Sequence, residues 1–248
     1  MLLSATEKPW LQAKNINMDS NLKDRFDKTM SENPFTHLGD AVYSLLYKSI
    51  IRMDIPDDEL LSDTALAKEL EVSRTPVHNA LIRLQDDGLI IKSSGQGFRV
   101  APLKEDECRH LMEVRLAVEG QAAMRAAERI TDEQLRKLDT LSEDYRNACN
   151  VWDEDAIIES DHSFHQLIVD SSCNPILKDI YRQISPRVLH YRYYMFRKTG
   201  QATLKPVILL SVRIHQSVKN AIRLGFSDTA QKQIERDIYG MTDIFGSW

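Results

Sequence analysis

A stripe of apolar residues marks one helix in the N-terminal half of the chain. Val77, Leu81 and Leu84 fall at i, i+4 and i+7, so a helix that starts at Ser73 buries all three on one face. Ser73 is a typical N-cap residue. A shorter helix is expected over residues 62–70, and the few residues between the two helices predict a tight turn.

Three further patterns complete this half. One apolar face predicts a helix over residues 38–53, and Gly88 predicts the end of the long helix. Two short apolar runs, 89–92 and 98–100, flank a Ser- and Gly-rich segment that is typical of a β-hairpin. Together these elements predict a winged helix-turn-helix domain, although any small helical hairpin gives a similar pattern.

The apolar stripe leaves the polar start of the long helix exposed. Free backbone N–H groups and the positive end of the helix dipole favour a phosphate there, and Arg and Thr suit base edges. The candidate DNA-contacting residues, with the hairpin tip included, are Ser73, Arg74, Thr75, His78, Ser94 and Gly95. Residues 36–102 carry seven Lys and Arg against ten Asp and Glu, a net charge of −3, so weak binding to random DNA is expected.

The pattern changes after Pro102, where strand signals and glycines become rare. Six amphipathic helices of ordinary length are expected, over residues 105–129, 132–150, 153–171, 175–198, 206–224 and 228–245. They predict an all-α bundle, a fold that builds ligand and metal sites from facing side chains. The fold class is therefore mainly α, with a winged helix-turn-helix domain over residues 35–102 and a six-helix bundle over residues 103–246.

Residues 1–34 show no sustained periodicity, which predicts a mobile N-terminal extension; a short helix over residues 22–30 is the alternative. The chain of 248 residues, 42% hydrophobic and 28% charged, has the composition of a soluble globular protein. Its apolar runs all fall short of the roughly 20 residues that span a membrane, and no secretory signal is expected. The three cysteines are far apart, so a cytoplasmic location without membrane association is expected.

Two imidazoles and a carboxylate lie at positions that a bundle can bring together. Asp161 and His165 share one helical face at i, i+4, and His215 lies between apolar residues on a later helix, which predicts that it faces inward. Such groups bind divalent cations such as zinc, nickel or manganese. The spacing alone favours a buried Asp–His hydrogen bond without a metal.

Residues 38–102 resemble the N-terminal domain of the GntR superfamily of bacterial transcription regulators. The resemblance rests on an ordered set of motifs at residues 56–63, 66–67, 72–77, 80–81, 83–84, 88–89 and 95–98. Four residues depart from the family pattern. Asp57 and Glu71 stand where Gly is usual, and Thr64 and His78 stand where Arg is usual.

Residues 105 to about 245 resemble the FCD ligand domain of the FadR-like branch of that superfamily. The signals are residues 113–116, Glu119, Asp161, 164–165, 174–175, His215, 221–222 and Gly225. Metal-binding members use one Asp and three His ligands. Asp161, His165 and His215 match three of these positions, and Asp237 stands at the fourth. A carboxylate can also ligate, so the resemblance implies a divalent ion (Zn, Ni or Mn) held by these four residues.

Arg115 lies within an apolar stripe of the first bundle helix, and an inward guanidinium needs an anion. An internal salt bridge to Glu119 is one interpretation, and a small carboxylate effector is the one that the family implies. Arg187, Tyr191 and Tyr194 share a helix face at i, i+4 and i+7 and would close the same cavity, although aromatic residues at this spacing are more often core.

The resemblance implies a transcription regulator that binds an inverted-repeat operator in double-stranded DNA as a homodimer and senses a small organic acid. A metalloenzyme that uses the Asp and His cluster is one alternative, and a metal-free sensor of acyl ligands is the other. The chain offers no additional base or nucleophile that favours the enzyme. Asp161, His165 and His215 argue against the metal-free sensor.

Overall fold

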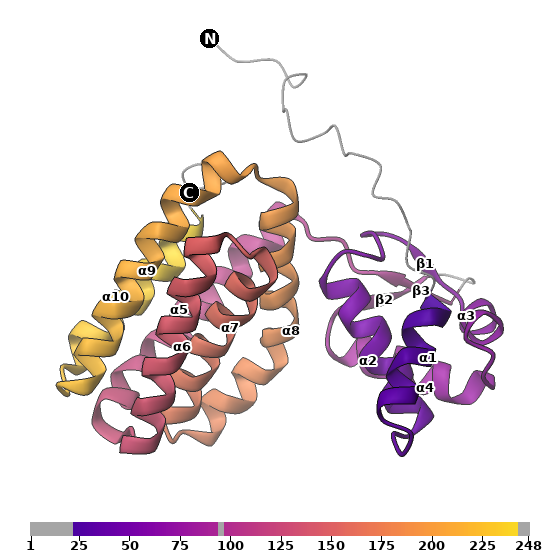
Figure 1. Ribbon diagram of the computed structural model, residues 1–248, viewed down its shortest axis with the longest axis horizontal. Helices are drawn as coiled ribbons and strands as arrows, with labels where there is room; N and C mark the ends of the chain where they lie inside the picture. Colours follow the sequence, from indigo (N-terminus) through magenta and orange to yellow (C-terminus); the bar gives the residue numbers. More distant parts are fainter. Residues whose placement is uncertain (1–21, 94–96, 243–248) are drawn as a thin grey trace, which may run out of the picture. The chain divides into compact units, whose positions relative to one another are not determined.

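The computed structural model describes residues 22–93 and 97–242 of the chain. The architecture is mainly α-helical, as the apolar pattern predicts, with one small sheet in the N-terminal part. The chain divides into two units, each described by itself (Figure 1). The first comprises the chain up to Pro102 together with Arg197–Thr199, and the second comprises the rest.

The first unit is a winged helix-turn-helix domain. Its helices are α1 (Leu22–Glu32), α2 (Leu38–Ile51), α3 (Asp63–Leu70) and α4 (Arg74–Asp86). Its strands are β1 (Leu60–Leu61), β2 (Ile90–Ser93) and β3 (Gly97–Val100). They form one antiparallel sheet in the order β1-β3-β2, in which Ile90 pairs with Val100 and Leu61 pairs with Phe98. The hairpin of β2 and β3 is the predicted one, whereas the two-residue strand β1 leaves no signal in the apolar pattern.

The apolar stripe of α4 lies at the centre of this unit. Val77, Leu81 and Leu84 are fully buried, as predicted. The helix packs against α2, whose Leu46 and Ile50 are also fully buried. Burying one such side chain contributes about 1.5–3 kcal/mol. This packing fixes the rotation of α4 and leaves its polar N-terminal residues exposed.

The turn between α3 and α4 contains a strained residue. Glu71 has φ 56° and ψ 39°, the left-handed conformation that favours Gly. Ser62 caps α3 by accepting a hydrogen bond from the backbone N–H of Ala65. Ser73 is the N-cap residue of α4, as expected, but its side chain makes no capping hydrogen bond within the described part of the chain. Its exposed hydroxyl is therefore available to a ligand.

Helix α1 corrects part of the expectation for the N-terminus. Residues 22–32 form an ordered helix that packs on α2 and α3, with Phe26 only 3% exposed. The ammonium group of Lys23 donates to the backbone oxygen of Leu70 at 3.5 Å and pairs with Glu71 at 3.2 Å. A single buried aromatic side chain gives little periodicity, which is why the pattern does not separate this helix from a mobile arm. Residues 1–21 lie outside the described residues.

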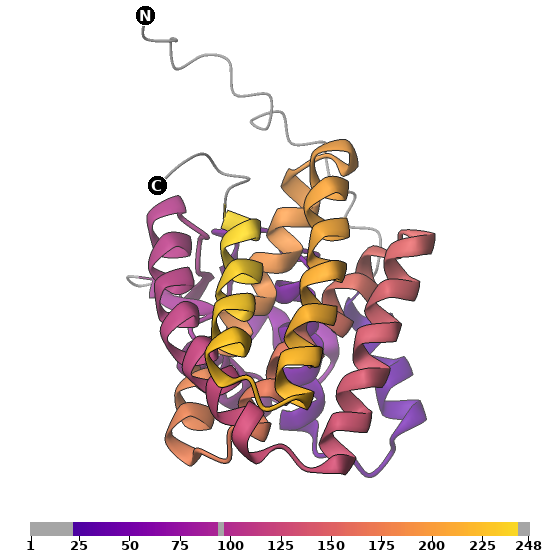
Figure 2. The same cartoon turned by 90° about the vertical axis from the view of Figure 1, so that its left-hand side faces the viewer.

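The second unit is a bundle of six helices: α5 (Glu105–Arg129), α6 (Asp132–Val151), α7 (Glu154–Ser171), α8 (Pro175–Lys198), α9 (Gln201–Arg223) and α10 (Ser227–Thr242). Helix α9 begins before the predicted Pro206, because Gly200 supplies the N-cap position and Pro206 lies inside the helix. Helix α10 packs against both α5 and α9 and lies between them in Figure 2. Among the described helices, none is both long and apolar enough to cross a membrane.

Small residues allow α5 and α10 to approach closely. Ala123 of α5 shares a buried cluster with Ala230 and Ile234 of α10. A Cβ atom on Gly120 would lie 2.8 Å from Oε1 of Glu235, so this position has no space for a larger residue unless that side chain moves. The close approach of α10 places its inward side chains opposite those of α7 and α9.

Candidate metal centre and nucleic-acid interface

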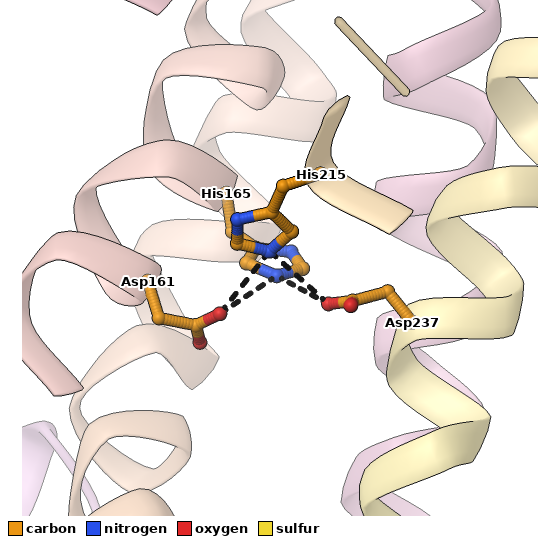
Figure 3. Close-up of side chains that lie close together, drawn as sticks. All are labelled: Asp161, His165, His215 and Asp237. Carbon is orange, nitrogen blue, oxygen red and sulfur yellow. Dashed lines mark hydrogen bonds and ion pairs between the residues drawn. The ribbon is translucent and has the colours of Figure 1, made fainter. Parts of the chain in front are cut away.

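Four side chains from three helices converge inside the bundle (Figure 3). Asp161 and His165 extend from α7, His215 from α9 and Asp237 from α10. One potential ligand atom of each lies within 4.8 Å of the other three. Asp161 is the most accessible of the four, with 16% of its side chain exposed. The structure therefore brings together the four residues that the sequence singles out.

Each imidazole of this cluster faces both carboxylates. Nε2 of His165 lies 3.1 Å from Oδ2 of Asp237 and 3.7 Å from Oδ1 of Asp161. Nε2 of His215 lies 3.3 Å from Oδ1 of Asp161 and 3.4 Å from Oδ2 of Asp237. Two nitrogens and two oxygens thus share one small space, which is a donor set that divalent transition metals accept.

Three of the four side chains are held from behind by a second partner. The contacts are Oε2 of Glu119 to Nδ1 of His165 at 2.5 Å, Nε of Arg192 to Oδ2 of Asp161 at 2.6 Å, and Oγ of Ser211 to Oδ1 of Asp237 at 2.6 Å. Partners of this kind fix the orientation of a ligand side chain and, for an imidazole, its tautomer. In each case the ligand atom that faces the shared space is the one that this partner leaves free.

His215 provides the test of whether a cation fits. The side chain is fully buried, and among the described residues Nδ1 has no hydrogen-bond partner. Nε2 has only the carboxylate oxygens of Asp161 and Asp237, which lie 3.3 and 3.4 Å away without hydrogen-bond geometry. The ring stacks on Phe164 with centroids 4.0 Å apart and lies 4.6 Å from the ring of Tyr145. An unsatisfied buried polar group costs about 1–3 kcal/mol. Bonding of Nε2 to a cation in the shared space would remove part of this cost, so the residues present fit a metal ion.

Without a metal, the carboxylates favour the protonated form of both imidazoles. Burial lowers the pKa of His165, but Glu119 and Asp161 outweigh it and raise that pKa to about 10. Burial likewise raises the pKa of Glu119, but Arg115 and His165 bring it down to about 2. Burial lowers the pKa of His215 as well, and its carboxylate neighbours again give a net increase. A cation must therefore displace protons from this site.

The charge of the buried cluster extends beyond the four candidate ligands. Glu119, Asp161 and Asp237 carry three negative charges, and Arg115 and Arg192 carry two positive charges. With neutral imidazoles the cluster has a net charge of −1, and a divalent ion would bring it to +1. A site of this charge attracts an anion once the cation is bound.

A small cavity opens beside the cluster. Its lining residues are Arg115, Asp161, His165, Tyr191, Arg192, Asp237 and Ile238. The empty space is about 240 Å³, including the open volume at its mouth. The enclosed part of this space is only about 10 Å³, which is room for about one water molecule, so the lining side chains must move to admit a small carboxylate.

Arg115 is buried and paired, yet one of its donors remains available. Its Nε donates to Oε1 of Glu119 at 2.6 Å and its Nη2 to Oε2 at 3.3 Å, so the internal salt bridge exists. Nη1 meets the sulfur of Met112 at 3.6 Å, a weak acceptor, and no other partner among the described residues. The pairing with Glu119 and a contact to a ligand are therefore compatible.

Two residues expected beside Arg115 are not part of the described cavity lining. The described lining of the cavity includes Tyr191 but neither Arg187 nor Tyr194. Nη2 of Arg187 lies 3.6 Å from Oε2 of Glu107, in the first turn of α5. Glu107 and Arg115 are separated by about two turns, or roughly 12 Å along the helix axis. The prediction relied on the helix face that Arg187 shares with Tyr191. Arg187 lies one turn before Tyr191 along α8 and therefore does not reach the cavity.

Arg192 is a cavity residue that the pattern analysis missed. It is 5% exposed, and its Nη1 donates to Nδ1 of His162 at 2.9 Å. Burial and the charge of Arg192 lower the pKa of His162 to about 3, so this imidazole is a neutral acceptor. The available signal was the one that identified Arg115: a charged residue inside an otherwise apolar helical stretch.

The predicted DNA-contacting residues that the structure describes are all exposed. Ser73, Arg74, Thr75 and His78 lie at the start of α4. The ring of His78 lies 6.2 Å from that of Phe98 on β3, so α4 and the wing meet there. Ser94 and Gly95, at the hairpin tip, lie outside the described residues.

Comparisons with known proteins agree with this architecture. Residues 38–100 match the family described as bacterial regulatory proteins, gntR family, and residues 110–239, just over half of the chain, match the FCD domain. The HTH-type transcriptional repressor RspR of Escherichia coli (strain K12) is 26% identical over 211 residues, which cover 85% of this chain and 90% of the relative. The HTH-type transcriptional regulator McbR of the same organism is 30% identical over 173 residues, which cover 68% of this chain and 78% of the relative.

Solved structures show the same fold. That of E. coli McbR/YncC gives a TM-score of 0.70 at 21% identity, covering 83% of this chain and 95% of the other. A GntR-type putative transcriptional regulator from Rhodococcus sp. RHA1 gives a TM-score of 0.68 at 16% identity, and the match covers 85% of this chain and 98% of the other. The enzyme hypothesis finds no support among these relatives, which are transcriptional regulators. The chain belongs to the GntR family of DNA-binding bacterial transcription regulators, with an FCD domain as its second domain, and it is a regulator rather than an enzyme.

Proposed function

We propose that this regulator binds an inverted-repeat operator as a homodimer and responds to a small carboxylate that enters the cavity beside a bound divalent metal. The observation that carries the proposal is the convergence of Asp161, His165, His215 and Asp237, in which Nε2 of His215 lies buried between two carboxylates without hydrogen-bond geometry to either. When bound, the metal supplies a Lewis acid beside the cavity. The protein orients the ligands and admits the effector.

The donor set favours harder cations than a three-histidine site would. Asp237 contributes an oxygen where metal-binding members of the family, on the resemblance described above, have an imidazole. Oxygen ligands suit manganese better than they suit zinc, and imidazole suits zinc and nickel. We therefore expect manganese to compete more successfully here than at a site with one Asp and three His, with zinc and nickel still able to bind.

The chemistry of the cavity selects an anion. Nη1 of Arg115 lacks a strong acceptor, and the net charge of the buried cluster is +1 when a divalent ion is present. A guanidinium donor recognises a carboxylate through charge-assisted hydrogen bonds. The polar lining and small volume disfavour a long acyl chain, which needs an extended apolar channel.

Dimerisation would cover apolar side chains that the single chain leaves exposed. Ile176 and Ile180 lie at i and i+4 on α8, with exposed fractions of 64% and 38%. Two copies related by a two-fold axis would present two α4 helices to two half-sites, which is the basis for expecting an inverted repeat.

Mass spectrometry under native conditions tests the proposal most directly. Purified protein should carry one divalent ion per chain and a small carboxylic acid, and acid treatment should release both. Loss of the ion from Asp161→Ala together with His215→Ala, at unchanged helical content, is the expected control result. A parent protein that binds no divalent ion at micromolar concentration in calorimetry would overturn the metal-centred part, and a monomer in light scattering would overturn the dimer.

A further inference from the structure

One carboxylate on α3 contacts two basic side chains at the start of α4, those of Arg74 and His78. Nη2 of Arg74 donates to Oδ1 and Oδ2 of Asp63 at 3.1 and 3.0 Å. Nδ1 of His78 lies 3.6 Å from Oδ2 of the same residue. The hydroxyl of Thr64 donates to Oδ1 at 3.1 Å, so the carboxylate is itself oriented. Asp63 thus links the first turn of α3 to the exposed end of the recognition helix.

We propose that Asp63 is a specificity-determining residue, which holds the guanidinium of Arg74 in one orientation for reading a base edge. Arg74 is well exposed, with 66% of its side chain accessible, and a free Arg loses much rotamer freedom when it binds. The ion pair removes part of that freedom before DNA arrives. Nε and Nη1 have no partner within the described residues, so donors remain for a base.

The base that suits this arrangement is guanine. Its O6 and N7 are the acceptors that Arg contacts most often in the major groove. A guanidinium held by a carboxylate has a fixed plane, and a fixed plane tolerates fewer base edges than a mobile side chain does. Discrimination at the base pair that Arg74 reads should therefore depend on Asp63.

The same carboxylate should weaken binding to DNA in general. Asp63 is ionised, because the hydrogen bond from Arg74 holds the pKa of that carboxyl below its usual value. A negative charge at the recognition surface repels phosphates, and the surrounding residues 36–102 already have a net charge of −3. Removal of Asp63 should thus raise affinity for unrelated DNA and lower discrimination. A residue that serves folding alone would lower affinity for all duplexes.

The test uses the full chain and begins by identifying the preferred DNA sequence. Selection from a random duplex library with the parent protein yields that sequence, and Arg74→Ala identifies the base pair whose substitution no longer matters. Fluorescence polarisation then compares Asp63→Asn with the parent on duplexes substituted singly at each position and on an unrelated duplex. We expect discrimination at the Arg74 base pair to fall about fivefold or more, and affinity for the unrelated duplex to rise about two- to threefold.

Three variants test whether Asp63 acts by orienting Arg74, by its negative charge, or by supporting the fold. Glu69→Gln removes one negative charge from the exposed side of the same helix and should leave discrimination unchanged. Asp63→Glu keeps the charge and should restore part of the discrimination. Thr64→Val removes the hydroxyl that orients Asp63 and should lower discrimination without changing affinity for unrelated DNA, which tests the idea even if Asp63→Asn fails to fold. Parent-like discrimination in a folded Asp63→Asn protein, or in Thr64→Val if the first does not fold, overturns the proposal.

Discussion

Ser211 donates a 2.6 Å hydrogen bond from its Oγ to Oδ1 of Asp237, across the contact between α9 and α10. Both side chains are buried, and Ser211 lies one turn before His215 on the same helix. The bond leaves Oδ2 as the Asp237 oxygen that faces the two imidazoles. Ser211 therefore positions one candidate metal ligand from the helix that carries another.

Removal of this hydroxyl should weaken metal binding without removing a ligand. Loss of a partner that orients a ligand typically lowers metal affinity about 10- to 100-fold, so calorimetric titration of Ser211→Ala should show a decrease of that size. Ser217→Ala is the matched control, because Ser217 lies on the same helix and its hydroxyl donates to the backbone of Arg213. Equal affinities of Ser211→Ala and the parent would show that Asp237 needs no such support.

The pKa of His165 predicts how metal affinity depends on pH. Burial opposes protonation, but Glu119 and Asp161 raise the pKa to about 10, so a metal must displace a proton from Nε2 at neutral pH. Affinity should therefore increase with pH between about 6.5 and 10, with proton release. Titrations in buffers of different ionisation enthalpy would measure the released protons. Glu119→Gln removes the largest favourable contact, so the pH dependence should move to lower pH.

The metal-free protein should show the opposite dependence. A histidine whose pKa is raised on folding contributes stability that is complete below its unfolded pKa of about 6.5 and is lost as the pH rises through about 10. Thermal unfolding with chelator should thus reveal a falling contribution across this window, while added metal restores stability most strongly at its upper end. A metal-induced increase in Tm that is independent of pH would contradict the coupling.

Glu71 predicts a stabilising substitution in the first unit. Its left-handed conformation costs a non-Gly residue about 1–2 kcal/mol, and Glu71→Gly removes this cost. The substitution also removes the ion pair with Lys23, and the greater chain entropy of Gly in the unfolded state offsets part of the gain. The clean comparison is made in a Lys23→Ala background, where urea unfolding should show Glu71→Gly to be modestly more stable. A less stable protein in that background would mean that the turn is not strained.

The elements that form the core were predictable because they obey a simple periodicity. Val77, Leu81 and Leu84 had to be buried together, and Asp161 and His165 had to share a face of α7. Asp237 could be placed from family spacing alone. By contrast, contacts between side chains on different helices cannot be predicted from the hydrophobic periodicity of either helix.

Arg192, Ser211 and Asp63 belong to that second kind. Each contacts a charged residue on another element: Asp161, Asp237 and Arg74 respectively. Arg187 shows the converse error, because a shared helix face fixes direction but not height along the axis. Periodicity therefore predicts which face of a helix lines a site, but it does not predict how far along the helix axis the site lies.

The substitution Asp237→His should change both the preferred metal and the strength of effector binding. With two carboxylates and two imidazoles as ligands, the parent should favour harder cations than a site with three imidazoles does. Asp237→His should raise affinity for zinc or nickel, by roughly tenfold, relative to manganese. Affinity for small carboxylates should also increase, because a divalent ion gives the buried cluster a charge of +1 in the parent and +2 in the variant.

Arg115 should then matter more in the parent than in this variant. Arg115→Ala removes one positive charge and a donor at the cavity, leaving no net charge in the parent but +1 in Asp237→His. The four proteins of this cycle can be titrated calorimetrically, first with metal and then with a panel of small organic acids. We expect Arg115→Ala to weaken acid binding more in the parent background than in the Asp237→His background. Equal metal affinity in Asp237→Ala and the parent would exclude Asp237 as a ligand, and its charge would then not govern the binding of the acid.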